Sequence, residues 1–246
     1  MALSRKQKLH KFMASTHKWV GLLVGIQVVL WVSGGVVMSW FPIEEVRGEH
    51  KIAKQVSVAI APSESILTFD AFQKATGQPL KQLTLDTLLG QPVAKVVTLD
   101  GAREIRDAIT GELFTPISAA MAQQIAEADY APDYPVQSVS ELIENTIDYR
   151  GPLPVWQINF ADDENTSLYV SPTQARVVGR RSSTWRLFDF FWMLHIMDYE
   201  ERHDFNNPLL ITFSISALIF AISGIFLLFF RFYRRDFNFI LGKKTR

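Results

Sequence analysis

Two long apolar runs dominate the pattern of hydrophobic and polar positions along the chain. Residues 19–41 and residues 209–230 contain no ionisable side chain. At 1.5 Å per residue, a helix of about 20 residues crosses the roughly 30 Å hydrocarbon core of a bilayer. The pattern therefore predicts two transmembrane helices, at residues 19–41 and at residues 208–231, the second with Pro208 at its first position.

A cleaved signal peptide is the alternative interpretation of the first run. The run is longer than the roughly 7–15 apolar residues of a signal-peptide core, and Ser39-Trp40-Phe41-Pro42 follows it instead of a small-residue cleavage site. We therefore predict an uncleaved membrane helix that Pro42 ends.

The region between the runs alternates between short helical and strand patterns. Thr68 can cap a helix that Gly77 closes, and alternating segments after it predict strands, with a hairpin turn at Asp100-Gly101. Residues 55–61 predict a further short strand. Helix, strand, strand, strand is thus the expected order.

The same order is predicted a second time. Residues 119–128 read as a helix, and Ser138 and Glu141 are spaced like a capping box for another helix through Ile147. Residues 154–181 alternate as strands. The region is predicted to be an α+β domain with antiparallel sheets and helices on one face.

Residues 185–198 form an aromatic, largely apolar segment that is too short to span a bilayer. We predict an amphipathic helix that lies in the outer membrane interface, and a turn at Asn206-Asn207 that leads into the second span.

Charge assigns a direction to this arrangement. Residues 1–40 carry five Lys or Arg and no carboxylate, and residues 231–246 carry six basic residues and one Asp. Of the 25 basic and 25 acidic residues, 14 basic and 24 acidic remain for residues 41–230, a net charge of −10. Cytoplasmic flanks of membrane helices are enriched in Lys and Arg, so both termini are predicted to be cytoplasmic and the acidic centre to be exported.

The predicted organisation follows. It consists of two transmembrane helices flanking an extracytoplasmic α+β domain, with the segments 1–18 (basic cytoplasmic lead-in), 19–41 (first span), 42–184 (exported domain, with units at about 62–117 and 118–182), 185–207 (interfacial helix and turn), 208–231 (second span) and 232–246 (basic cytoplasmic tail). In a Gram-negative bacterium this is an inner-membrane protein with a periplasmic domain.

Composition excludes several kinds of chemistry. The chain has no cysteine, so it forms no disulfide and offers no thiolate for a metal or for covalent haem attachment. Nucleophile motifs, phosphate-binding loops and dinucleotide fingerprints are absent, and nothing indicates nucleic-acid binding.

Small residues in the first span are candidates for helix packing. Gly21 and Gly25 form a GxxxG pair, and Gly34 and Gly35 add a second small patch. Small residues are also common in membrane helices that pack against nothing. Gln27, near the middle of the span, favours an interhelical hydrogen bond.

His195 is the main candidate for chemistry, and three interpretations of it stay open. It can be a structural histidine bonded to Asp198 or to a loop carbonyl, or an axial haem ligand in aromatic surroundings. The third interpretation is a metal or proton site with Asp198 and His203. His17 is a second candidate haem ligand, but it lies at the other end of the bilayer, so the two histidines cannot share one iron within a monomer. A homodimer would instead present two copies of His195 at the outer face and two copies of His17 at the inner face.

Two pieces of the central region resemble PepSY units, in which a strand, a turn and a strand end in an Asp-x-x-Thr-Gly-Glu turn. The first piece, residues 93–113, matches at Asp107, Thr110, Gly111 and Glu112; the second, residues 158–178, has Ser171, Pro172, Gln174 and Ala175 at that turn. Residues 9–40 and 193–229 resemble the first and last helices of PepSY-associated transmembrane proteins.

The resemblance implies function only in outline. Some larger members of this family accompany iron-uptake systems, and some are haem-bearing reductases of iron chelates. PepSY units also resemble inhibitory parts of protease propeptides, and such sheets bind peptides along an edge or groove. We expect an accessory protein that presents a periplasmic PepSY-like domain to a membrane or periplasmic partner, and no catalytic residues. The alternative is a haem b electron-transfer protein, a homodimeric ferric-chelate reductase in iron uptake.

Overall fold

The computed structural model describes residues 4–54 and 65–231, which fall into two compact units. One unit contains the described parts of residues 1–40 and 188–246, and the other contains those of residues 41–187. The strand predicted at residues 55–61 and the basic tail at 232–246 lie outside the described residues.

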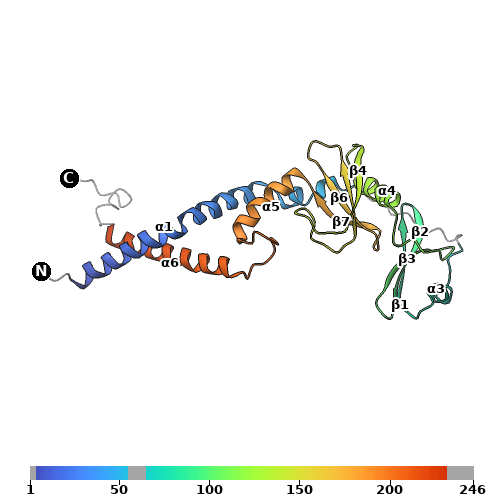
Figure 1. Ribbon diagram of the computed structural model, residues 1–246, viewed down its shortest axis with the longest axis horizontal. Helices are drawn as coiled ribbons and strands as arrows, with labels where there is room; N and C mark the ends of the chain where they lie inside the picture. Colours follow the sequence, from blue (N-terminus) through green and yellow to red (C-terminus); the bar gives the residue numbers. More distant parts are fainter. Residues whose placement is uncertain (1–3, 55–64, 232–246) are drawn as a thin grey trace, which may run out of the picture. The chain divides into compact units, whose positions relative to one another are not determined.

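The first unit is built on two long apolar helices, α1 (Arg5–Trp40) and α6 (Pro208–Arg231), which run side by side (Figure 1). Both are long and apolar enough to cross a membrane, as the sequence predicts. Pro208 begins α6, and the Asn207 side-chain oxygen caps it by accepting a hydrogen bond from the Leu210 amide at 2.8 Å.

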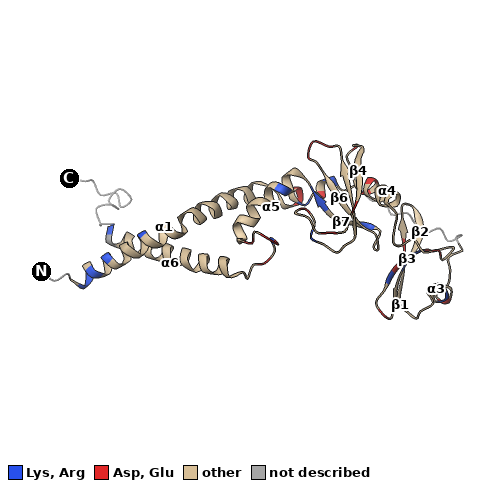
Figure 2. Cartoon of the chain, viewed as in Figure 1, with Lys and Arg blue, Asp and Glu red and all other residues tan. Residues whose placement is uncertain are grey.

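The predicted basic lead-in is not a separate element. Residues 5–18 contain neither glycine nor proline, and α1 continues through them without a break. Figure 2 shows that Lys and Arg colour the first turns of α1 and the last turn of α6, whereas the remaining length of both helices is almost free of charge.

The aromatic segment forms α5 (Ser183–Ile196), which ends because Met197 adopts a left-handed backbone conformation with φ of 53°. The second half of α5 packs along α1. Gln27 donates its amide to the Leu194 carbonyl at 2.9 Å, and the backbone oxygen of Phe191 lies 3.6 Å from the Cβ position of Gly34. These contacts lie within the apolar run of α1, thirteen and six residues before Trp40 at its end, whereas we predicted a helix in the membrane interface.

The second unit contains a three-stranded antiparallel sheet, ordered β1-β2-β3, and one helix. Helix α3 (Phe69–Thr76) begins and ends at the predicted Thr68 and Gly77, and the strands are β1 (Leu80–Leu88), β2 (Gln91–Thr98) and β3 (Arg103–Asp107). The hydroxyl of Thr68 accepts a hydrogen bond from the Ala71 amide, and Gly77 has a left-handed conformation.

A four-stranded antiparallel sheet, ordered β4-β5-β6-β7, follows helix α4 (Ala119–Asp129). Its strands are β4 (Val136–Leu142), β5 (Val155–Phe160), β6 (Ser167–Ser171) and β7 (Arg176–Arg181). A short helix α2 (Ile43–Val46) and a 3-10 turn η1 (Glu49–Lys51) precede both sheets.

The predicted helix from Ser138 to Ile147 is wrong, because those residues begin with strand β4. The Ser138 hydroxyl does not cap a helix; it accepts a hydrogen bond from the Asn159 side chain on β5 at 2.9 Å. Glu141 pairs with Trp156 in the ladder. Pairing along β5 therefore overrides the local capping signal.

The two sheets share one core. Val93 and Ile105 from the first sheet pack in the same buried cluster as Ile125 from α4 and Ile158 and Leu168 from the second sheet. A smaller cluster holds α3 on the first sheet through Phe72, Ala94 and Val96.

The turn after β3 and the turn after β6 have the same backbone design. Gly111 donates its amide to the Asp107 carbonyl at 3.0 Å, and Ala175 donates to the Ser171 carbonyl at 2.9 Å. Gly111 and Ala175 both have positive φ, 79° and 46°. Ala175 thus adopts a conformation that glycine favours, and does so with its methyl group in the shared core.

Candidate functional site

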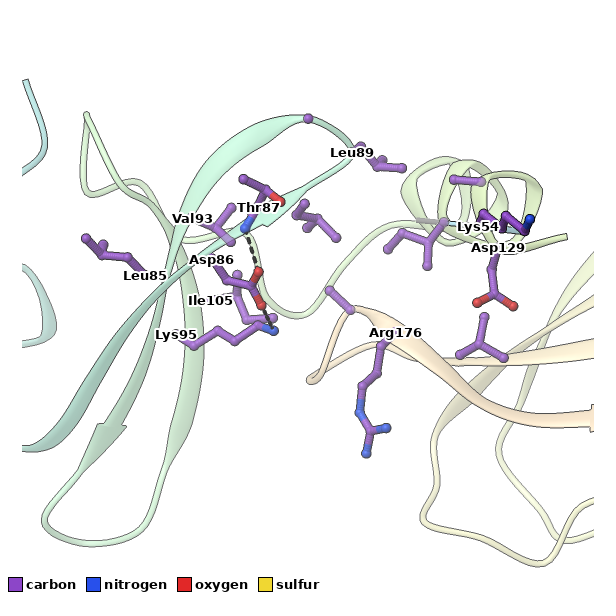
Figure 3. Close-up of a pocket in the computed structure, with 16 residues that line it drawn as sticks. Lys54, Leu85, Asp86, Thr87, Leu89, Val93, Lys95, Ile105, Asp129 and Arg176 are labelled. Carbon is purple, nitrogen blue, oxygen red and sulfur yellow. Dashed lines mark hydrogen bonds and ion pairs between the residues drawn. The ribbon is translucent and has the colours of Figure 1, made fainter. Parts of the chain in front are cut away.

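A groove of about 790 Å³ opens where the β1–β2 hairpin, α4 and the start of β7 come together in the second unit (Figure 3). Its floor consists of apolar side chains that also belong to the shared core: Val93, Ile105, Ile125, Ala175 and Val177. Both sheets therefore contribute to a single concave surface.

The hairpin at one side of the groove has a two-residue turn. Leu88 pairs with Gln91, and the residues between them, Leu89 and Gly90, have φ of 51° and 82°. Such a turn normally carries Asn-Gly or Gly-Gly, because a left-handed conformation costs an ordinary residue roughly 1–2 kcal/mol. Leu89 nevertheless occupies it with a half-exposed side chain that lines the groove.

Three of the charged side chains that line the groove, Asp86, Lys95 and Asp129, form ion pairs. Lys95 forms an ion pair with Asp86, which holds the pKa of that carboxyl below its usual value. Asp129 forms an ion pair with Arg180.

The two other cations of the groove, Lys54 and Arg176, have no carboxylate partner among the described residues. Arg176 donates instead to the neutral side chain of Gln174 at 2.9 Å. The groove therefore combines an apolar floor with excess positive charge at its edge, which suits an extended apolar segment that carries a carboxylate.

Sequence reasoning did not find this groove. Leu89-Gly90 between two alternating segments was a signal, since leucine is a poor choice for a tight turn. Lys54 and Arg176 gave no signal of their own, because they are separated by more than a hundred residues and line the same groove only through the fold.

The candidate ligand His17 packs inside the pair α1–α6. Its ring stacks on Phe220 with centroids 4.2 Å apart, and its Nδ1 lies 3.0 Å from the Ser223 hydroxyl and 3.1 Å from the Phe220 carbonyl. The Cε1 atom of the ring is 3.0 Å from the Cβ position of Gly224. His17 thus joins two helices.

His195 lies near the end of α5, between two tryptophans. Its backbone carbonyl accepts a hydrogen bond from the indole of Trp31 at 2.8 Å, and the rings of Trp31 and Trp192 have centroids 6.5 Å from the imidazole. Its Nδ1 atom is buried and has no hydrogen-bond partner within the described part of the chain.

The structure does not bring His195, Asp198 and His203 together as ligands. Because α5 ends at Ile196, the Asp198 carboxylate points into the following loop. There it accepts hydrogen bonds from the backbone amides of four residues: Glu200, Glu201, His203 and Asp204. These bonds lower the pKa of Asp198 to about 2. Within residues 4–54 and 65–231, no group of three His, Asp or Glu side chains can hold a metal ion.

Of the four glycines predicted for helix packing, two lie against another helix and two do not. A Cβ at Gly21 would lie 2.6 Å from the ring of Phe220 on α6, and a Cβ at Gly34 would lie 3.6 Å from the Phe191 carbonyl on α5. Gly25 and Gly35 have nothing within 4 Å of that position among the described residues.

Two apolar helices, one before and one after a two-sheet α+β unit in the sequence, define a membrane protein with a separate β-rich domain. The model of the PepSY-associated TM region matches residues 7–246, and the chain belongs to this family. No curated protein and no solved structure matches the chain.

A haem can be tested against these residues. His195 fits as one axial ligand, because a buried imidazole nitrogen without a partner in aromatic surroundings suits haem iron. The pair His17 and His195 does not fit within one chain. His17 packs against α6, and fourteen residues of α1, about 21 Å of helix, separate it from Trp31 beside His195.

Proposed function

We propose that this chain is an accessory protein of the bacterial inner membrane, which presents a periplasmic PepSY-like domain to a membrane or periplasmic partner. The groove between the two sheets carries the proposal. It offers an apolar floor for a partner's side chains and two cations, Lys54 and Arg176, for a partner's carboxylate.

The bound element we propose is an extended segment of the partner protein. The volume of about 790 Å³ is of the size that binds a few side chains. The apolar floor takes alternate side chains of such a segment, and the cations at the edge fix its direction.

We also propose that the domain consists of two PepSY-like units, at about residues 62–117 and 118–182. The equivalent turns at Asp107–Gly111 and Ser171–Ala175 support this division. In this view the groove lies where the two PepSY-like units meet. The charge of −10 on residues 41–230 keeps the domain soluble outside the membrane.

Site-specific photo-cross-linking tests the function. A benzophenone amino acid replaces Leu85 or Leu89 at the groove and, as a matched control, Leu99 at the exposed β2–β3 turn. In membranes of the source organism we expect one partner adduct from the two groove positions and none from position 99.

Charge reversal makes the test specific. The double variant Lys54→Glu, Arg176→Glu should abolish the adduct, whereas Arg103→Glu, an exposed change elsewhere in the domain, should preserve it. The same adduct from position 99, or no effect of the groove reversal, would remove the groove from the function.

A second candidate function rests on the unpartnered Nδ1 of His195. We infer that a homodimer could hold one haem b between two copies of His195 for electron transfer in iron uptake, because one chain supplies only one suitable histidine. A Soret band in the protein purified from haem-replete cells, lost in His195→Ala and kept in His203→Ala, would support it. A colourless preparation would exclude it and leave the accessory role unaffected.

A further inference from the structure

The connection between β4 and β5 exposes two large apolar side chains. Ile143 and Ile147 are 73% and 64% exposed, more than any other isoleucine described in this domain. They lie four residues apart in a loop that has no regular secondary structure.

This loop is held in a fixed shape. Thr146 donates its amide to the Tyr149 carbonyl at 2.9 Å, and the Tyr149 amide donates to the Thr146 hydroxyl at 3.1 Å. Tyr149 stacks on Tyr169 of β6 with centroids 4.7 Å apart, and its hydroxyl donates to the Pro152 carbonyl. Ile147 therefore lies within a segment whose backbone is held by hydrogen bonds and by the packing of Tyr149.

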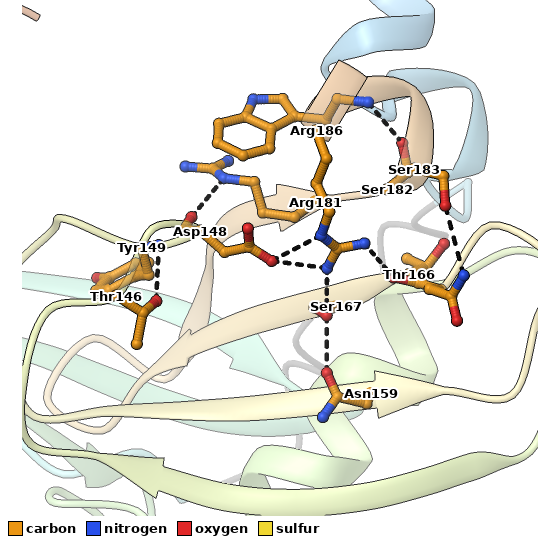
Figure 4. Close-up of polar contacts among 12 residues, drawn as sticks. Thr146, Asp148, Tyr149, Asn159, Thr166, Ser167, Arg181, Ser182, Ser183 and Arg186 are labelled. Carbon is orange, nitrogen blue, oxygen red and sulfur yellow. Dashed lines mark hydrogen bonds and ion pairs between the residues drawn. The ribbon is translucent and has the colours of Figure 1, made fainter. Parts of the chain in front are cut away.

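The loop is also tied to the first turn of α5 (Figure 4). Arg186 donates to the Asp148 carboxylate at 2.7–2.8 Å, and Arg181 donates to the Asp148 backbone carbonyl at 2.6 Å. Arg186 stands two residues before Phe188, where the chain enters the unit that contains the two membrane helices. Asp148, next to Ile147, is thus bonded to a residue that stands just before the helical unit in the sequence.

The composition around this point is typical of a membrane surface. Arg181 stacks over the Trp185 ring at 4.0 Å, and Arg and Trp are favoured in the headgroup region, where a cation meets lipid phosphate and an indole lies at the boundary. Leu187 and Phe190 on α5 are exposed as well. Glu144, between the two isoleucines, is exposed, which fits a shallow contact that leaves its carboxylate in water.

We propose that residues 143–149 form a membrane-contact loop, which inserts Ile143 and Ile147 into the headgroup boundary of the phospholipid bilayer beside the first turn of α5. The loop would then give the domain a second attachment to the lipid surface in addition to its covalent links. A preferred orientation of the domain on the membrane follows from two attachments.

Single-cysteine labelling tests the loop directly, since the chain has no cysteine of its own. Ile143→Cys and Ile147→Cys are labelled with the environment-sensitive fluorophore NBD, and Leu99→Cys, 66% exposed at the β2–β3 turn, is the matched control. The full-length variants are reconstituted into vesicles of phosphatidylethanolamine and phosphatidylglycerol, with and without brominated acyl chains.

We expect the labels at 143 and 147 to emit at shorter wavelength than the label at 99, and brominated lipid to quench them but not the control. All three positions are exposed, so the substitutions do not disturb packing. Labels at 143 and 147 that behave like the control would overturn the proposal. A shift to shorter wavelength without quenching by bromine would also overturn it, because a second protein copy, and not lipid, would then cover the loop.

Discussion

Trp31 donates its indole hydrogen to the backbone carbonyl of His195 at 2.8 Å, well within the apolar part of α1. Nine residues of α1, about 14 Å of helix, separate Trp31 from Trp40 at the end of the helix. The aromatic helix α5 is therefore part of the helical unit over its second half, and two backbone carbonyls near its end, those of Leu194 and His195, accept hydrogen bonds from α1.

The bond from Trp31 should contribute measurably to stability. In Trp31→Phe the His195 carbonyl loses a donor, and we expect the free energy of unfolding to fall by about 1 kcal/mol. Trp40→Phe, which changes an exposed ring of the same helix, should have little effect. Unfolding of the purified protein by SDS, followed by circular dichroism, measures both, and equal losses would mean that the hydrogen bond contributes nothing.

Substitutions at Gly21 and Gly25 distinguish a glycine that is needed for helix packing from one that is not. Gly21→Val places a side chain where Phe220 already lies, so we expect a loss of about 1–3 kcal/mol from forced displacement of α6. Gly25→Val faces open space in the chain and should leave monomer stability unchanged.

The same pair of variants reports on self-association. If Gly25→Val weakens a dimer measured by cross-linking in detergent, the open face of α1 is the dimer contact. An equal loss of monomer stability in both variants would contradict the packing of α1 against α6.

A buried network around Asp162 predicts a loss of stability in acid. Burial alone would raise the pKa of this carboxyl, but hydrogen bonds from Thr166, Tyr130 and Lys51 lower it to about 2 from 3.8. A carboxyl with a depressed folded pKa stabilises the protein above its unfolded pKa and loses that contribution as pH falls through the folded pKa.

We therefore expect the network to contribute about 2 kcal/mol at pH 7 and to lose it between pH 4 and pH 2. Asp162→Asn should be less stable than the natural protein at pH 7 and should lack most of this acid-dependent loss. Thermal unfolding of the full chain in detergent at pH 7 and pH 3 tests this. A variant with the same acid dependence as the natural protein would show that another carboxyl is responsible.

We expect a substitution of Leu89 to raise the stability of the domain and to weaken its binding to the partner. Leu89→Asn replaces leucine in a left-handed turn with a residue that tolerates it, so the domain should become more stable by about 0.5–1 kcal/mol. The groove loses an apolar side chain, so capture of the partner from position 85 should weaken. Higher stability with undiminished capture would show that Leu89 has no part in binding.

Local signals predicted the parts of the fold that local forces decide. Thr68 and Gly77 mark α3 correctly because capping needs only neighbouring backbone groups, and uninterrupted apolar runs define α1 and α6. Strand β4 was missed because Ser138 and Glu141 resemble a cap, while the partner that decides their conformation, β5, is distant in sequence.

The site could be predicted less well than the fold. His195 was identified as unusual from its aromatic neighbours, but a helical continuation to Asp198 was assumed, and Met197 ends the helix before the carboxylate can face the ring. The groove depends on Lys54, Leu89 and Arg176, which only tertiary packing brings together.

The proposed accessory role requires residues 41–187 to lie on the outer side of the inner membrane. Because the chain lacks cysteine, Leu99→Cys in the domain and Gln7→Cys at the start of α1 each provide one reporter. With a membrane-impermeant maleimide applied to intact spheroplasts, we predict labelling of Cys at position 99 and labelling at position 7 only after the membrane is broken. Labelling of position 7, and not of position 99, in intact spheroplasts would contradict the topology.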